Sequence, residues 1–327
     1  MSLKAIRRKA KKSVYDFFVM RPKYWLNLDY LKLANLIKGF SGRQSQTKDS
    51  QGEQLSTLNT SKKVLILHQY LPSYIAQELV PGGPGFGDFL KGSMALCRLA
   101  KKYGLAIDLD LSSHPLSKFL VPNPNQYKFT GDIKEFVQIT NSPPDVSGYL
   151  RTLQSPGVYP IYTNLYHPYQ FNADISRLIV PRVALNSEAN QELEARVAKL
   201  PAQGYFVIHA RISDPQFHSE IDIPREMSKF IEHIPSAMHH KILVVSNNQI
   251  LREKLHARYG LPFSGGATAH VGEAGSSQDA LLNTLLDFHL MARSKGIIQF
   301  SSYGWGSGFS DACAALFNLP VMHFKIA

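Results

Sequence analysis

The segment 204–216, GYFVIHARISDPQ, is an apolar strand that ends in a histidine and an arginine. The strand pattern covers 205–210, and Asp214-Pro215 ends it. Side chains at positions i and i+2 of a strand point to the same side, so we expect His209 and Arg211 to face one space together. In open α/β sheets, ligands bind at the carboxyl ends of the strands. The segment therefore predicts a ligand site at this strand end.

Strand and helix patterns alternate on both sides of this segment, which is typical of parallel sheets with crossover helices. Two such sets divide near 195–203, so we predict an α/β fold with two Rossmann-like domains facing a cleft, covering 62–200 and 201–327. The expected strands are 63–70, 105–112, 157–166, 205–210, 241–247, 295–302 and 320–324; the expected helices are 88–103, 187–200, 225–233, 248–258, 278–292 and 307–317.

The positive charge of the chain is concentrated before the first domain. Residues 1–48 hold twelve Lys or Arg and two Asp, a net charge of +10, whereas the whole chain carries +11. Basic residues with interleaved aromatics in 1–40 suit the surface of an anionic membrane; a solvated arm, or an arm packed on its own domain or on a second subunit, is the alternative. Residues 41–61 are polar and indicate a flexible linker. The segment 1–61 is therefore expected to be a basic amphipathic arm with a linker.

Composition points to a soluble globular protein, with 44% hydrophobic residues and a mean hydropathy of −0.16. The sequence has no run of 18 apolar residues and no apolar region after its basic start, so we expect neither a membrane-spanning helix nor a secretory signal. Cys97 and Cys313 lie in apolar helical patterns and indicate neither a disulfide framework nor a metal cluster. A cytoplasmic location is expected.

A glycine-rich loop opens the helix that starts near 88. Gly85, Gly87 and Asp88 lie where free backbone N–H groups and the helix dipole favour phosphate or sugar oxygens. The Gly-Lys-Ser/Thr of a P-loop is missing, and so is a dinucleotide fingerprint with an acid about twenty residues on, although Asp108 lies near that position. A plain tight turn is the alternative.

A third stretch, 276–316, combines a helix, a short strand and a Ser- and Gly-rich turn, which again forms an anion-binding end. Asp287 lies among apolar residues of the helix and needs a partner, because burial of an unpaired carboxylate is costly. Its alternatives are a cap or an ion pair with Arg293. His209 could equally be a buried, hydrogen-bonded histidine, and Arg211 could form a structural ion pair with Asp214.

Together these stretches resemble the GT-B fucosyltransferases that use GDP-fucose, a family that includes nodulation α1,6-fucosyltransferases, their animal α1,6 relatives and protein O-fucosyltransferases. The motifs that carry the resemblance are GFGDFLKG, HARISD and LLDFHLMARSKGIIQFSS, in that order over roughly 62–320. The resemblance implies an acceptor-side domain at 62–200 and a nucleotide-sugar domain at 201–327. It implies GDP-fucose or a related GDP-sugar as donor substrate, no permanently bound cofactor and no metal.

The resemblance also implies roles for single residues. Arg211 would be the essential arginine on the β-phosphate, and His209 and Asp287 would bind the guanine. A serine of the last turn would bind the phosphates. Counted from the preceding strand this serine is Ser302, and counted from the following helix it is Ser307. The chain departs from the family pattern at Ile212, at Ser213 and at Ser246-Asn247.

Transfer with inversion needs stabilisation of the departing diphosphate and a base for the acceptor proton. Arg211 and a helix N-terminus can supply the first without a metal. The candidates for the base are Asp214, His218, Glu220 and Asp222, and the resemblance favours Glu220.

Three other interpretations remain open: a GT-B transferase that uses another nucleotide sugar, a metal-dependent GT-A transferase built on Asp108-Leu109-Asp110, and a non-catalytic, membrane-associated transferase-like subunit. Nucleic-acid binding is not expected, because the globular body is nearly neutral. We expect an oligosaccharide or lipid-linked glycan as acceptor, with the protein peripheral on the inner membrane face.

Overall fold

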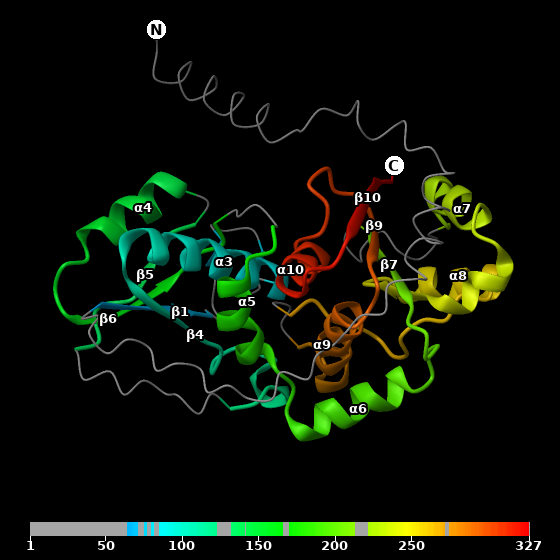
Figure 1. Ribbon diagram of the computed structural model, residues 1–327, viewed down its shortest axis with the longest axis horizontal. Helices are drawn as coiled ribbons and strands as arrows, with labels where there is room; N and C mark the ends of the chain where they lie inside the picture. The colour runs from blue at the N-terminus through cyan, green and yellow to red at the C-terminus, as the bar shows by residue number, and fades with distance from the viewer. Residues whose placement is uncertain are drawn as a thin grey trace, which may run out of the picture.

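The protein contains two parallel four-stranded sheets, one toward each end of the molecule, with helices between them and outside them (Figure 1). The α/β class expected from the sequence is confirmed. The cleft and the domain boundaries stay predictions, and the arm and linker of 1–61 lie outside the described residues. The computed structural model describes residues 64–70, 75–76, 80–81, 85–122, 132–140, 142–165, 170–212, 222–271 and 275–326.

The first sheet has the strand order β4-β1-β6-β5, and each neighbouring pair is parallel. Its strands are β1 (Val64–Gln69), β4 (Ala106–Asp110), β5 (Val137–Gln138) and β6 (Gly157–Tyr162). The helices of this half are α3 (Phe86–Tyr103), α4 (Pro143–Thr152), α5 (Ala173–Ile179) and the 3₁₀ turns η2 (Ser117–Phe119) and η3 (Val180–Val183). The strands β2 (Ile75–Ala76) and β3 (Val80–Pro81) form a short antiparallel pair.

The second sheet has the order β10-β9-β7-β8, again parallel throughout. Its strands are β7 (Phe206–Arg211), β8 (Ile242–Ser246), β9 (Ile297–Ser301) and β10 (Val321–Lys325). The helices are α6 (Ser187–Val197), α7 (Arg225–Glu232), α8 (Gln249–Tyr259), α9 (Gln278–Ala292), α10 (Gly308–Phe317) and the 3₁₀ turn η5 (Ser236–Lys241).

Every strand and helix expected from the sequence coincides with an observed element, whereas α4, α5 and β5 were not expected. The prolines before and at the start of α4 hid that helix, and β5 and α5 have only two and seven residues. Proline is tolerated in the first turn of a helix, where its missing N–H has no intrahelical acceptor, and α4 begins at Pro143. Helix α5 is capped by Asn172, whose side chain accepts the backbone N–H groups of Asp174 and Ile175.

The two faces of β7 pack against different layers. Ile208 and Ala210 belong to a core with α7 and α8, whereas Val207 belongs to the core shared with α9 and α10. Alternation along the strand therefore directs His209 and Arg211 toward the α9 and α10 side. The contact of His209 with α10 places that side chain on this face. That Arg211 shares the face stays a prediction from the alternation of the strand.

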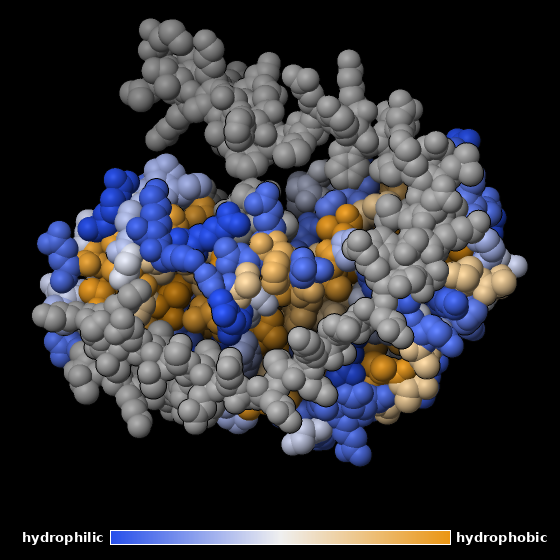
Figure 2. Space-filling model, viewed as in Figure 1, coloured by the Kyte–Doolittle hydropathy of each residue, from blue (hydrophilic) through white to orange (hydrophobic). Residues whose placement is uncertain are grey.

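One hydrophobic core joins the two halves of the chain. Helix α3 packs against α10, and the ring of Phe86 on α3 meets that of Phe288 on α9 edge to face, with centroids 5.1 Å apart. Figure 2 shows hydrophobic residues in the middle of the view, where α5 and α10 lie, and polar residues over α6. In the described part of the chain, no helix combines the length and the apolar composition needed to cross a bilayer.

A buried ion pair holds η3 against the first sheet. The carboxylate of Asp108 on β4 is fully buried and accepts two bonds from Arg182, at 2.8 Å from Nε and 2.9 Å from Nη2. The carboxylate of Asp110, two residues further on, accepts a hydrogen bond from the side-chain amide of Gln69. The carboxylates of the Asp-x-Asp string thus have protein partners, which disfavours the GT-A interpretation. Among the described residues, no three His, Cys, Asp or Glu side chains gather as a metal site.

Arg182→Met should destabilise the protein by about 3–5 kcal/mol, because it leaves the Asp108 carboxylate buried without its cation. Urea unfolding measures this loss. Arg177→Met is the matched control, since it breaks the exposed pair with Asp174 and should cost less than about 1 kcal/mol. Equal losses in the two variants would contradict a buried, structural role for the Asp108–Arg182 pair.

Candidate functional site

His209 is buried on β7 and is tied to the first turn of α10. Its Nδ1 lies 2.8 Å from the Ser310 hydroxyl, and its ring lies against Phe309. Burial lowers the pKa of His209 to about 3, and the nearby Arg211 cation adds to this lowering. The ring is therefore neutral near pH 7, and Nδ1 can accept the Ser310 hydroxyl proton. Nε2 remains to meet a ligand.

Arg211 ends β7 and is partly exposed. Its guanidinium lies 5.6 Å from the centroid of the Tyr303 ring, and its backbone carbonyl accepts the N–H of Ser302 at 3.1 Å. The Ser302 hydroxyl has no hydrogen-bond partner in the described structure although it is buried. The backbones of Arg211 and Ser302 thus adjoin each other at the strand end, and the cation and the hydroxyl that they carry are groups that suit an anionic ligand.

The end of β7 is fixed from the neighbouring strand. Asn247, directly after β8, accepts the N–H of Ile212 at 3.1 Å and donates to the carbonyl of Ile212 at 3.0 Å. Ser246 donates to the carbonyl of Ala210 at 2.8 Å. These three bonds bracket Arg211 and hold its backbone in place.

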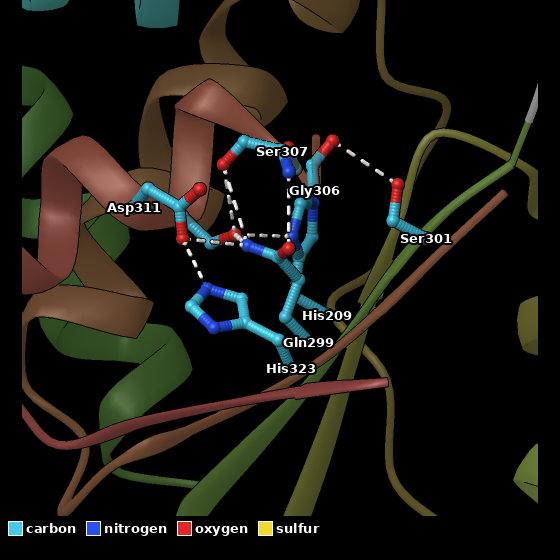
Figure 3. Close-up of polar contacts among 8 residues, drawn as sticks. His209, Gln299, Ser301, Gly306, Ser307, Asp311 and His323 are labelled. Carbon is cyan, nitrogen blue, oxygen red and sulfur yellow. Dashed lines mark hydrogen bonds and ion pairs between the residues drawn. The ribbon is translucent and has the colours of Figure 1, made fainter. Parts of the chain in front are cut away.

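Gln299 on β9 fixes the first turn of α10, as Figure 3 shows. Its Oε1 accepts the N–H of Ser307 at 3.0 Å, and its Nε2 donates to Ser310 Oγ at 2.7 Å and to Asp311 Oδ1 at 2.9 Å. Asp311 also bonds His323 of β10, at 2.6 Å from Nε2. Gln299 of β9, His209 of β7 and His323 of β10 together therefore hold the helix N-terminus against three strands.

The N-termini of α3 and α10 meet through glycine. A Cβ on Gly87 would lie 2.6 Å from the backbone nitrogen of Phe309 and 2.7 Å from the carbonyl carbon of Gly308. Gly85, the N-cap of α3, lies against the side chain of His270, and neither Gly85 nor Ser307 makes a side-chain cap bond. Two positive helix ends, one from each half of the chain, thus converge beside His209.

Asp88, which the sequence grouped with these glycines, has a different role. It forms an ion pair with Lys91, 2.7 Å from Nζ, and its side chain is half exposed. The carboxylate lies in the first turn of α3, where it interacts favourably with the helix dipole. Its contacts are those of a helix terminus.

Asp287 on α9 forms a second group with Ser264 and Arg252, called here the Asp287 cluster. Burial raises the pKa of Asp287 to about 6, while the nearby Ser264 hydroxyl and the Arg252 cation oppose the rise. Asp287 Oδ1, Ser264 Oγ and Arg252 Nε are all buried, and none has a hydrogen-bond partner among the described residues. Three unsatisfied polar atoms in one place are costly unless a ligand completes them.

The segment after α8 carries this cluster and is held by helices on both sides. Arg252 donates to the carbonyls of Ser264 and Gly266, and Asn283 of α9 donates to that of Ala267. Arg196 of α6 bonds Asn283 in turn, at 2.6 Å. The polar atoms of the Asp287 cluster are therefore rigidly placed.

Comparison with known proteins gave a result at the level of structure only. No family model matches the chain, and no curated protein matches it. Solved structures that resemble it include several fucosyltransferases.

Three of these structures show the range of the likeness. The fucosyltransferase NodZ from Bradyrhizobium is 14% identical at a TM-score of 0.48, over 81% of this chain and 95% of that one. A mutant of FUT1 from Arabidopsis thaliana in complex with GDP is 11% identical at a TM-score of 0.45, over 81% of this chain and 72% of that one. POFUT1 in complex with GDP-fucose is 9% identical at a TM-score of 0.39, over 82% of this chain and 99% of that one. Similarity at these scores carries no argument about the function of this chain.

The structure brings together some of the residues singled out in the sequence and separates others. His209, Gly87 and Ser307 all meet the first turn of α10, and Arg211 adjoins Ser302. Asp287 lies in a separate group, and the alternative of an ion pair with Arg293 is wrong, because Arg293 binds Glu194 in a bidentate pair.

The candidates for the catalytic base were Asp214, His218, Glu220 and Asp222. The first three lie outside the described residues. Asp222 is almost fully exposed and pairs with Lys254 at 3.1 Å. Glu220 therefore stays a prediction.

Sequence reasoning missed Ser310, Gln299 and Ser264. Ser310 and Gln299 lie inside the motif stretch, and their polar character in a buried helix turn and a buried strand was the available signal. Asn247 was noted only as a departure from the family pattern, although it clamps the end of β7. Nothing in the sequence singled out Ser264.

Gly87→Ala should destabilise the protein by about 1–3 kcal/mol, because the added methyl group meets backbone atoms of α10 that cannot yield. Gly148→Ala in α4 is the matched control: a Cβ there meets nothing within 4 Å, so alanine should stabilise by about 0.5–1 kcal/mol. Thermal unfolding of both variants measures the difference. If Gly87→Ala were neutral, the close contact between α3 and α10 would be refuted.

Asp287→Asn should stabilise the protein at pH 8 but not at pH 4. Between the unfolded value near 3.8 and about 6, the folded state binds a proton at Asp287 that the unfolded state does not, so the free energy of unfolding falls as pH rises through this window. The full penalty, on the order of 3 kcal/mol, is present above pH 6 and is absent in the variant. Urea unfolding at several pH values tests this. Parallel pH profiles for the two proteins would contradict it.

Proposed function

We propose that this protein is a glycosyltransferase that transfers fucose from GDP-fucose to a hydroxyl group of a glycan, with inversion and without a metal. One observation carries the proposal. His209 of β7 bonds to the first turn of α10, and Arg211 ends the same strand beside the Tyr303 ring. The backbone carbonyl of Arg211 accepts the N–H of Ser302, whose hydroxyl has no partner among the described residues. A diphosphate requires this combination of a fixed cation and fixed hydrogen-bond donors.

The diphosphate of the donor lies, in this proposal, between Arg211 and the first turn of α10. The planar guanidinium can form two parallel bonds to phosphate oxygens. Ser302 adds a hydroxyl donor, and the convergent helix ends of α3 and α10 add positive potential. Between the two serines left open by the sequence, the unpaired Oγ favours Ser302, and Ser307 contributes to the anchoring of the helix end through its backbone.

The Asp287 cluster supplies the preference for guanine. Guanine presents a ring N–H and an amino group on one edge, and a carboxylate with an unpaired oxygen can accept from both. Uracil offers one such donor and adenine offers only its amino group. Binding of guanine would satisfy Asp287 Oδ1, whose present lack of a partner is costly. His209, which the resemblance places on the guanine, can contact the base only through Nε2, because its Nδ1 is bonded to Ser310.

The transfer step follows from these contacts. As the bond between fucose and the β-phosphate breaks, negative charge grows on the diphosphate, and the fixed cation and helix end stabilise it without reorganising. The acceptor hydroxyl attacks from the opposite side of the sugar and loses its proton to a base. Glu220 is the proposed base.

Other parts of the proposal concern the surroundings of the site. The acceptor is an oligosaccharide or a lipid-linked glycan, and the basic arm of residues 1–40 contacts an anionic membrane from the cytoplasmic side. The charge of +10 in residues 1–48 motivates this. Sedimentation of the full chain with phosphatidylserine vesicles at low salt tests it, and equal sedimentation with neutral vesicles would contradict it.

GDP should raise the melting temperature of the wild-type protein without added metal, whereas UDP, ADP and CMP should not. Arg211→Ala should bind GDP about 10- to 100-fold more weakly, because a charge-assisted bond to phosphate is lost. Arg258→Ala is the matched control: Arg258 also lies over a tyrosine ring, at 5.0 Å from that of Tyr259, but on α8. Thermal shift with the four nucleotides measures both effects.

Each other result has a definite meaning. A shift with UDP in place of GDP would keep a nucleotide-sugar site and reject fucose from GDP-fucose as the substrate. No shift with any nucleotide would reject the transferase and favour a non-catalytic subunit. An equal loss of GDP binding in Arg258→Ala would reject the specific role of Arg211.

A further inference from the structure

The turn between β9 and α10 presents a tryptophan to solvent. Trp305 is 75% exposed, and its ring stacks on that of Tyr303 with centroids 5.0 Å apart and an angle of 30° between the planes. Tyrosine and tryptophan side chains are enriched at binding interfaces, because each combines a large apolar face with a polar atom. The flanking residues, Gly304 and Gly306, have no side chains to shield the indole.

Hydrogen bonds hold this turn in one conformation. The Tyr303 N–H donates to Ser301 Oγ at 3.1 Å, and Ser301 Oγ donates to the carbonyl of Gly306 at 3.1 Å. The Gly306 N–H donates to the carbonyl of Tyr303 at 3.1 Å. Gly306 has φ of 81°, and a Cβ there would lie 2.5 Å from Gln299 Oε1. The aromatic pair is therefore a preorganised surface, which lowers the entropic cost of binding.

The pair lies next to the proposed diphosphate site. Tyr303 contacts both the Arg211 guanidinium and the Trp305 ring, so two ring contacts link Trp305 to the strand end. The loop between β9 and α10 lies near the top of the coloured ribbon in Figure 1, beside β10. A ligand group on Trp305 would thus be close to the sugar attached to the β-phosphate.

Sheet order places Trp305 and the Asp287 cluster on opposite sides of Arg211. In the order β10-β9-β7-β8, the turn with Trp305 follows β9, on one side of β7. The segment with Ser264 runs beside β8, where Phe263 bridges to Val244, on the other side of β7. A nucleotide sugar is linear, from base through diphosphate to sugar. With its base at Asp287 and its diphosphate at Arg211, the sugar end points toward Trp305.

We propose that the exposed face of Trp305 binds a pyranose ring of the acceptor glycan. The face of an indole carries negative charge density, and one side of a gluco-configured pyranose presents several C–H groups with a slight positive charge. Stacking of such a ring covers the indole and leaves the sugar hydroxyls at its rim for reaction. The inference rests on the proposed function for the identity of the second substrate, while the stacking itself is measurable without turnover.

The chain offers a direct probe, because its two tryptophans are Trp25 and Trp305. In the full chain with Trp25→Phe, emission reports on Trp305 alone. Methyl β-glucoside and cellobiose should shield this fluorescence from acrylamide, whereas GDP and the open-chain polyol mannitol should not. Thermal shift with GDP is measured on the same protein.

The outcomes separate the two proposals. If GDP binds but neither glycoside shields Trp305, the sugar platform is overturned and the proposed function stands. If GDP alone shields Trp305, the indole stacks on the base and the platform is again overturned. If the glycosides shield Trp305 and no nucleotide binds, the platform stands and the proposed function fails.

Once a turnover assay exists, Trp305→Ala should raise the KM for the acceptor about tenfold or more, the usual effect of losing a central tryptophan contact, with the KM for the donor unchanged. Trp305→Phe should recover part of the loss. Phe171→Ala is the matched control, since Phe171 is also an exposed aromatic residue, at 46%, but precedes α5. A tenfold change in donor KM with no change in acceptor KM would overturn the assignment.

Discussion

The close contact between the N-termini of α3 and α10 constrains the rest of the structure. It exists because Gly87 has no side chain: a Cβ would lie 2.6 Å from the backbone of α10. This contact lets one hydrophobic core run through both halves of the chain. It also places the first turn of α10 where His209 and Gln299 can bond to it, so that the ends of β7 and β9 and two helix N-termini share one region.

Polar groups without partners mark where this region is incomplete. Most buried polar groups of a folded protein are hydrogen-bonded, yet Ser302 Oγ beside Arg211 and three atoms of the Asp287 cluster have no partner in the described structure. Ser302 follows β9 on one side of β7, and the Asp287 cluster lies beside β8 on the other. In the proposed function, the diphosphate of the nucleotide lies at the first of these places and its base at the second. The raised pKa of Asp287, about 6, has the same origin, because burial disfavours the charged carboxylate until a donor meets it.

Local patterns predicted the strands and helices, and the period of two along β7 predicted that His209 and Arg211 share a face. Contacts between distant residues could not be predicted in this way: His209 and Ser310 are 101 positions apart, and Ile212 and Asn247 are 35 apart. The alternative pairing of Asp287 with Arg293 failed for a local reason, since residues six apart on a helix do not share a face. The helix α4 was missed because its opening prolines look like a loop.

The most direct test of the account is to compare GDP with guanosine by isothermal titration calorimetry. If Arg211 and the helix end bind a diphosphate, wild type should bind GDP at least about tenfold more tightly than guanosine, and Arg211→Ala should lose most of this difference while its affinity for guanosine stays the same. Equal affinities of the wild type for GDP and guanosine would contradict the account, and so would a GDP preference that survives in Arg211→Ala.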